Sequence, residues 1–261
     1  MSCKVIMVTS FKGGVGKSTV AANIALRLAC NGKKTLLVDC DFRMRSLDIL
    51  LGVENNIVYD AGDVLTGDCT LSRAVMTDKR NSNLFFLPAP YNWQKGIDGN
   101  KFAEMIDEAK KIFFLDYIVL DTPGSSGQEF GVAAENADIA YIVANHSFPS
   151  IRAAEVTGSE LADMGVEERR LVINMFDMSG KDSDKKPSVV DIIDKTYLRL
   201  GGIIPFDSRM SLLQDSGLLV DELKNCNIAK AFTNLVNRTE GKNIPLFAGF
   251  KKINKSKLLG Q

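Results

Sequence analysis

The sequence predicts an α/β fold, a single doubly wound and mostly parallel sheet with helices on both faces, of the P-loop NTPase type. Near the N-terminus an apolar run leads into a glycine-rich turn and then into a segment with helical spacing. Short buried strands alternate with helical segments along the chain, as expected for parallel sheets covered on both faces. No internal repeat or Ser/Gly-rich linker interrupts the 261 residues, which favours one domain.

The glycine-rich turn separates a strand at residues 5–9 from a helix at residues 20–29. Glycines let successive backbone N–H groups converge on an anion, and the helix N-terminus adds partial positive charge. We expect Lys17 to reach the β- and γ-phosphates and Ser18 to bind Mg²⁺ directly. Phe11 stands where the common pattern has its first glycine, and a second lysine follows it. The expected nucleotide-binding residues are Lys12, Gly13, Gly14, Val15, Gly16, Lys17, Ser18 and Thr19. A turn that merely connects strand to helix is the alternative.

Acidic residues stand at the ends of two later strands. Residues 34–39 form an apolar run that ends in Asp39, with Asp41 two positions further on. Residues 116–121 form a second run that ends in Asp121, in the manner of a Walker B strand. The carboxyl ends of parallel strands share one edge, so these carboxylates are expected beside the phosphate loop. Loop solvation or helix capping is the alternative interpretation of Asp39 and Asp41.

The rest of the chain continues the alternation of strands and helices. Short helical and turn pieces are expected over residues 57–82. Hydrophobic spacing predicts further strands over 83–90, 137–144, 170–175 and 201–205. It predicts further helices over 101–114 and 225–238. The single histidine, His146, follows a strand and is interpreted as a polar loop residue.

The charge balance and the cysteines exclude several classes of protein. Formal net charge is zero, so no global field favours nucleic acid or membrane. Residues 241–261 nevertheless hold five lysines and no acid, which leaves residues 1–240 with a charge of −5. Five scattered cysteines without a C-x-x-C pair argue against Fe–S ligation and a disulfide framework. Without a recognisable signal peptide or membrane-spanning run, a cytoplasmic protein is expected.

The basic C-terminal segment suggests a second functional region. We therefore divide the chain into a P-loop ATPase domain at 1–240 and an amphipathic tail at 241–261. On a helical wheel, most apolar residues of the tail fall in one arc, and most lysines lie off it. This composition is typical of a helix at an anionic membrane surface. A docked terminal helix or a disordered tail is the alternative. The predicted membrane contacts are Leu246, Phe247, Phe250, Lys251, Lys252, Ile253 and Leu258.

The nucleotide motifs together resemble those of the deviant Walker A family of ATPases. The segments that carry the resemblance are residues 12–19, Asp39-Cys-Asp41 and Asp121-Thr-Pro123. The resemblance extends over nearly the whole chain to the septum-placing MinD branch of that family. The further segments that look like MinD are 45–48, 58–60, 67–71, 78–80, 83–89 and the basic tail. The resemblance implies a Mg²⁺-dependent ATPase that converts ATP to ADP and phosphate and helps to position the division septum.

The resemblance also implies roles for the loop and its neighbours. In that family ATP closes a two-fold homodimer, so Lys12 would reach the partner's phosphates and Lys17 those of its own subunit. Asp39 and Asp121 would orient magnesium-bound waters. Asp41, also at the edge of the metal shell, would position the attacking water. Adenine would contact Asn174, Pro205 and Asp207.

The implied partners are an anionic membrane on the inner face of the cell membrane and MinC- and MinE-like regulators. Hydrolysis would release the protein from the membrane. The sequence departs from the family after Pro123, at Ala153, at Ser46 and at residues 217–219, on surfaces that sense nucleotide and receive MinE. A DNA-binding partition ATPase of the ParA type and a weakly hydrolysing scaffold are the rival interpretations. We expect no nucleic-acid partner, because the positive charge lies in the tail.

Overall fold

The computed structural model describes residues 3–179, 186–223 and 226–251, and these residues form one eight-stranded sheet. The strand order is β3-β4-β2-β5-β1-β6-β7-β8. All neighbours pair in parallel except β3, which runs antiparallel to β4 at the edge. The strands are β1 (Lys4–Thr9), β2 (Thr35–Asp39), β3 (Met76–Thr77), β4 (Leu84–Leu87), β5 (Tyr117–Asp121), β6 (Ile139–Asn145), β7 (Glu168–Phe176) and β8 (Arg199–Pro205). The predicted fold class is confirmed.

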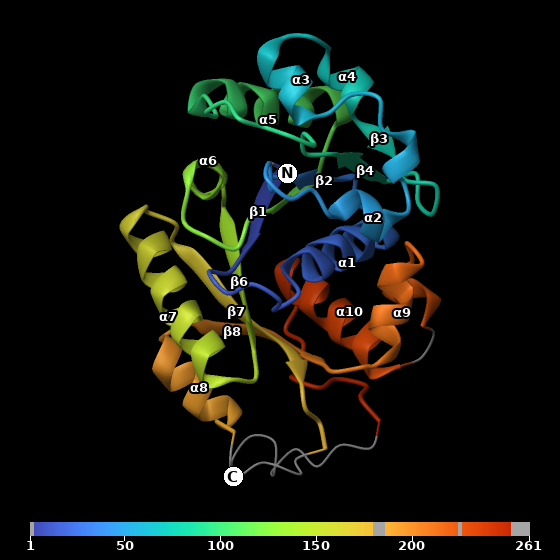
Figure 1. Cartoon of the computed structure of the whole chain (residues 1–261). Coiled ribbons are helices and arrows are strands. Elements are labelled where there is room, and N and C mark those ends of the chain that lie inside the picture. The colour runs from blue at the N-terminus through green and yellow to red at the C-terminus, as the bar shows by residue number, and fades with distance from the viewer. Residues whose placement is uncertain (1–2, 180–185, 224–225, 252–261) are drawn as a thin grey trace.

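Helices cover both faces of this sheet (Figure 1). They are α1 (Lys17–Cys30), α2 (Leu47–Leu51), α3 (Ala61–Thr66), α4 (Leu71–Ala74), α5 (Gly99–Phe113), α6 (Gln128–Glu135), α7 (Phe148–Asp163), α8 (Val189–Thr196), α9 (Arg209–Asp215) and α10 (Asn227–Thr239). Short 3₁₀ turns lie at Glu54–Asn56 and Val220–Glu222. Helices α1 and α10 pack on one face of the sheet, and α5, α6, α7 and α8 pack on the other.

The alternation of side chains along each strand divides the interior into two cores. Val5 and Met7 of β1 point into the core beneath α5–α8, whereas Ile6 and Val8 point into the core beneath α1 and α10. Successive residues of a strand face opposite sides of the sheet, so a strand buried on both sides must be apolar throughout. This requirement explains why the central strands were readable from the sequence as apolar runs.

The strand order places β1 at the centre of the site-forming edge. β1 lies between β5 and β6, and Val8 is level with Asp121 on β5. Asp121 is in turn level with Asp39 on β2. The crevice where connections leave a parallel sheet in opposite directions is the usual ligand-binding position in such folds.

Two elements, the edge strand β3 of two residues and the helix α2, were not predicted. The short helices α3 and α4 lie in the stretch 57–82, where short helical and turn pieces were expected without individual bounds. Segments of four to six residues contain too few turns for hydrophobic periodicity to reveal them. Residue 60 does carry a capping signal, because Asp60 and Asp63 form a capping box at the start of α3.

The structure corrects the prediction for the first part of the tail. Residues 246–251 form turns rather than a helix. Phe247 is only 4% exposed, and Leu246 and Phe250 pack partly buried against the body. Phe247 and Gly249 both adopt positive φ, which a continuing right-handed helix does not allow. The predicted contacts Lys252, Ile253 and Leu258 lie outside the described residues. Over the described ranges, no helix has the length and apolar character needed to cross a membrane.

Candidate nucleotide-binding site

The glycine-rich loop between β1 and α1 has the backbone conformation of an anion cradle. Gly14 and Gly16 have φ of +75° and +86°, in the left-handed region that favours glycine. A Cβ on Gly16 would lie 2.5 Å from Asn174 Nδ2, whereas a Cβ on Gly13 or Gly14 would meet nothing within 4 Å. The loop is therefore open toward solvent at Gly13 and Gly14 and closed against β7 at Gly16.

The two lysines of the loop differ in exposure and in surroundings. Lys17, at the first position of α1, is half-buried, and a Cβ on Gly124 would lie 3.2 Å from its Nζ. This places the Lys17 ammonium between the phosphate loop and the loop after β5. Lys12 is exposed, and none of the ion pairs among residues 3–179, 186–223 and 226–251 involves it. Lys12 is therefore available to a group outside its own subunit.

Two buried carboxylates lie side by side at the carboxyl ends of β2 and β5. Asp39 and Asp121 are level with each other in the sheet and are 0% and 1% exposed. The Asp39 carboxylate accepts the backbone N–H of Asp41 at 3.0 Å and that of Leu47 at 3.3 Å. Oδ1 of Asp121 is buried and has no hydrogen-bond partner among the described residues.

Burial and mutual repulsion change the ionisation of this pair. Burial raises the pKa of Asp39 well above its usual range, and the neighbouring Asp121 charge raises it further. Burial likewise raises the pKa of Asp121 to about 7, while a hydrogen bond from Ser18 and the Lys17 charge oppose that rise. The site lacks enough positive charge to stabilise both carboxylates in their ionised form.

A divalent cation would supply the missing charge. The Asp121 oxygen without a partner and the Ser18 hydroxyl next to it are the oxygen donors that Mg²⁺ prefers. Within the described part of the chain, no group of three or more His, Cys, Asp or Glu residues could hold a metal by itself. Mg²⁺ is usually bound by one or two carboxylates together with waters and substrate phosphates. The residues present fit the metal.

Asp41 lies in the loop that follows β2, and its carboxylate organises that loop. Oδ1 accepts the backbone N–H groups of Arg43 at 3.3 Å and Met44 at 3.0 Å. Through its own N–H, Asp41 is also tied to Asp39. The Arg43 side chain reaches Glu129 of α6, a largely buried carboxylate, at 3.5 Å. Asp41 is thereby held by β2 and by its own loop, and the Arg43 side chain links that loop to α6.

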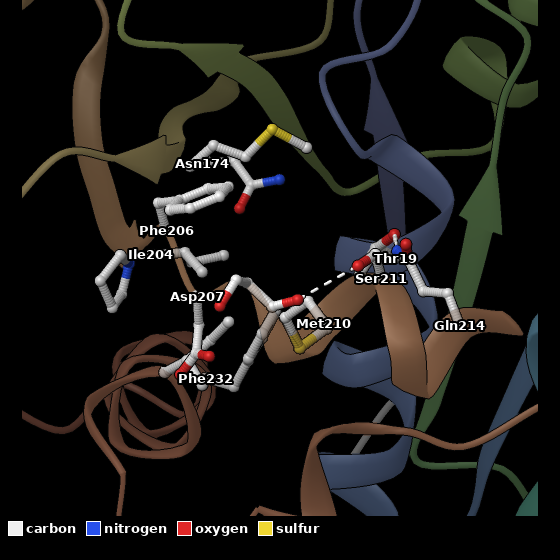
Figure 2. Close-up of a pocket in the computed structure, with 13 residues that line it drawn as sticks. Thr19, Asn174, Ile204, Phe206, Asp207, Met210, Ser211, Gln214 and Phe232 are labelled. Atoms are coloured by element: carbon white, nitrogen blue, oxygen red, sulfur yellow. Dashed lines mark hydrogen bonds between the residues drawn. The ribbon is translucent and has the colours of Figure 1, made fainter. Parts of the chain in front are cut away.

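A pocket of about 220 Å³ lies beside the phosphate loop (Figure 2). Asn174 of β7 lies on its wall and donates from Nδ2 to the Val15 carbonyl at 2.8 Å. Pro205 and Asp207 line the pocket, and Arg209 holds the Asp207 carboxylate with two hydrogen bonds of 2.9 and 2.6 Å. Apolar side chains complete it: Met175, Ile204, Phe206, Met210, Ile228 and Phe232. A largely apolar pocket with a few polar groups suits a purine base.

The structure brings the predicted phosphate, metal and base residues to one edge of the sheet, and the described tail residues Leu246, Phe247, Phe250 and Lys251 do not line the base pocket. Thr19 joins the two parts of the site, because its hydroxyl accepts a hydrogen bond from Gln214 of α9 on the pocket wall. Gln214 and Glu129 were not predicted. A lone polar residue on a short helix has no periodic or motif signal, and only the tertiary fold brings these two to the site.

Comparisons with known proteins agree with this geometry. The family model described as "ParA: NUBPL iron-transfer P-loop NTPase" matches residues 2–240. The septum site-determining protein MinD of a Synechocystis strain is 37% identical over 244 residues, which cover 93% of this chain and 91% of that protein. MinD of Escherichia coli K12 is 34% identical over 253 residues, 93% of each chain.

Solved structures give the same relationship. The MinC:MinD cell division complex of Aquifex aeolicus matches with a TM-score of 0.87 at 34% identity, covering 96% of this chain and 99% of that one. MinD of Pyrococcus horikoshii, solved with Mg-ADP, matches with a TM-score of 0.80 at 26% identity, covering 91% and 96%. The chain therefore belongs to the MinD family of P-loop ATPases.

Proposed function

We infer that this chain is a MinD-type ATPase that acts in selection of the division site, binding Mg-ATP at the edge of β1, β2 and β5. The observation that carries this conclusion is the convergence of the phosphate loop, two buried strand-end carboxylates and a base pocket in a chain of this family. The Pyrococcus relative was solved with Mg-ADP, and the Aquifex relative with MinC. We extend both ligands, magnesium nucleotide and a MinC-like regulator, to this chain.

The residues of the site would have separate roles in phosphoryl transfer. Backbone N–H groups of Gly13, Gly14 and Gly16 would cradle the phosphates, and Lys17 would neutralise them. Ser18 would hold Mg²⁺ directly, and Asp39 and Asp121 would hold it through water; the metal would supply positive charge at the phosphate oxygens. Phosphoryl transfer gains mainly from placed charge and orientation.

Two further groups would complete the reaction. Asp41, held by the backbone of its own loop, would orient the attacking water. Lys12, exposed and unpaired within the described residues, would complete the site of a second copy in an ATP-dependent homodimer. Assembly of the dimer would then be required for hydrolysis.

We further propose that the dimer binds an anionic membrane surface through its basic tail. Residues 1–240 carry a charge of −5, and residues 241–261 carry +5, so attraction to anionic lipid is confined to the tail. One tail binds weakly, and two tails on one dimer raise the effective concentration for the second contact. ATP would control membrane residence, and hydrolysis would end it. The protein would then be peripheral on the inner face of the membrane.

Deletion of residues 252–261 tests the membrane proposal. A deletion from residue 242 would also remove buried Phe247 and confound stability with membrane binding, whereas the shorter deletion leaves every described contact in place. We expect the shorter protein to keep its ATPase activity and to lose ATP-dependent cosedimentation with phosphatidylglycerol vesicles. Equal cosedimentation of both proteins would refute it. Nonspecific DNA binding by the ATP-bound full chain would instead favour a ParA-type partition function.

A further inference from the structure

Residues 244–251, which we call the strap, fold back along α10 in the opposite direction. Arg238, near the end of α10, donates to the carbonyls of Ile244 and Pro245 at 2.8 and 2.9 Å. One turn earlier along the helix, Asn234 donates to the carbonyl of Ala248 at 2.9 Å. The strap thus returns toward the start of the helix.

The first turn of α10 holds the end of the strap. Lys230 donates to the Gly249 carbonyl. Asn227 forms a reciprocal pair with Lys251, donating to its carbonyl at 3.0 Å and accepting its N–H at 2.9 Å. Both backbone groups of one residue are satisfied there, which fixes the direction as well as the position of the chain.

The helix residues that hold the strap form one stripe. Asn227, Lys230, Asn234 and Arg238 are spaced by three, four and four residues, so they lie on one face of α10. All four bind backbone groups of the strap rather than side chains. Such contacts persist through changes in strap sequence and depend on the strap keeping its backbone conformation.

An apolar anchor accompanies these hydrogen bonds. Phe247 is 4% exposed and packs edge-to-face against Phe250 with ring centroids 5.4 Å apart. It adopts φ of +59°, which is unfavourable for a non-glycine residue and is maintained by its surroundings. Gly249 follows at φ of +72°. For Phe247 to insert into lipid on a helix, its pocket would have to empty and both positions would have to change conformation.

We propose that the stripe on α10 is a permanent anchoring surface for the strap, and that the membrane-contacting part of the tail begins after Lys251. This proposal rests on the proposed membrane function. Residues 252–261 keep the composition that attraction to anionic lipid requires, with three lysines and three large aliphatic residues. Leu246, Phe247 and Phe250 then belong to the body, and the strap sets the point from which the tail departs.

Hydrogen exchange of the full-length protein tests this anchor. The amides to follow are those of Ala248, Phe250 and Lys251, which donate to Pro245 O, Phe247 O and Asn227 Oδ1. We expect their protection to agree within twofold in the nucleotide-free protein, with ATP, and with ATP plus phosphatidylglycerol vesicles. A tenfold or greater loss of protection at Phe250 and Lys251 in either ATP state would overturn the proposal, because it would mean that the strap is released.

Two variants of α10 calibrate the measurement. Asn227→Ala removes the acceptor of the Lys251 amide and is expected to speed its exchange at least tenfold. Asn237→Ala, whose side chain accepts from Lys242 rather than from the strap, is expected to leave it unchanged. If the wild-type protein does not cosediment with vesicles, the membrane function fails. The exchange rates without and with ATP then still decide whether the anchor holds.

Discussion

At the residue scale, Asp39 and Asp121 make the site dependent on pH before any nucleotide binds. Burial raises both pKa values, so the folded protein retains protons that the unfolded chain releases near pH 4. Between about pH 4 and 7 the folded state therefore binds more protons. The contribution of this pair to the free energy of unfolding of the nucleotide-free protein should therefore fall as pH rises through that window.

Asp121→Asn isolates that contribution. Because the variant removes one of two buried like charges, we expect it to raise the free energy of unfolding at pH 8 by on the order of 2 kcal/mol. The difference from wild type should shrink toward pH 4. Urea unfolding at several pH values without nucleotide measures both effects. A variant less stable than wild type at pH 8 would contradict this assignment of charge, and Mg-ATP binding by the variant should be severely weakened.

Lys12 gives a second residue-scale prediction. Because this lysine is exposed and has no ion-pair partner in the described part of its own chain, Lys12→Ala should leave the unfolding midpoint unchanged. ATP-dependent dimerisation and hydrolysis should both be lost, with a fall in kcat of at least a hundredfold. Size-exclusion chromatography with ATP and phosphate release measure them. Normal turnover by a monomeric variant would exclude a role across the dimer interface.

At the element scale, two glycines of the phosphate loop allow the cost of backbone strain to be measured apart from the cost of a steric clash. Gly14→Ala adds a Cβ at positive φ with no neighbour within 4 Å, and should cost about 1–2 kcal/mol of stability. Gly16→Ala has the same strain and also drives a Cβ to 2.5 Å from Asn174 Nδ2, so it should cost more. Denaturant unfolding without nucleotide compares the two variants, with Gly13→Ala as a control that carries neither penalty. Equal stability of Gly14→Ala and Gly16→Ala would exclude a close contact with β7.

Elements also show what the sequence could and could not predict. The strands β1, β2 and β5 are buried on both faces, so their apolar runs and terminal acids were visible directly. The same holds for the lysines and glycines of the loop, whose roles follow from a local motif. The wall of the base pocket brings together residues of α1, β7, β8, α9 and α10, and no local pattern predicts that assembly.

The tail shows where periodicity misleads. Leu246, Phe247 and Phe250 match a helical arc in the sequence, yet they pack on the body from turns. An apolar residue near a chain end satisfies a helical wheel and a core pocket equally well. Here the core beneath α5–α8, which takes up Phe247, and the row of polar side chains on α10 favour the packed conformation, and neither is visible in the tail sequence itself.

At the scale of the whole molecule, release from the membrane should depend on hydrolysis, so a mutation that slows hydrolysis should also delay release. Asp41→Ala keeps the phosphate loop and Lys12 while removing the carboxylate proposed to orient water. We expect this variant to bind ATP, to hydrolyse it at least tenfold more slowly, and to remain on phosphatidylglycerol vesicles after wild-type protein has left. Cosedimentation over time after one addition of ATP measures this. Release of the variant at the wild-type rate would refute the link between hydrolysis and detachment.

The helix α10 has two occupied sides, and their arrangement affects the reach of the tail. Ile228 and Phe232 face the base pocket, while Asn227 holds the end of the strap. A helix of 13 residues spans roughly 20 Å at 1.5 Å per residue. By doubling back over that length, the chain returns to the start of α10, whose residues Ile228 and Phe232 line the base pocket, rather than leaving at the far end of the helix. In a dimer closed over its nucleotides, the two departure points would be drawn toward the shared interface, so a short pair of tails could meet the same small patch of lipid.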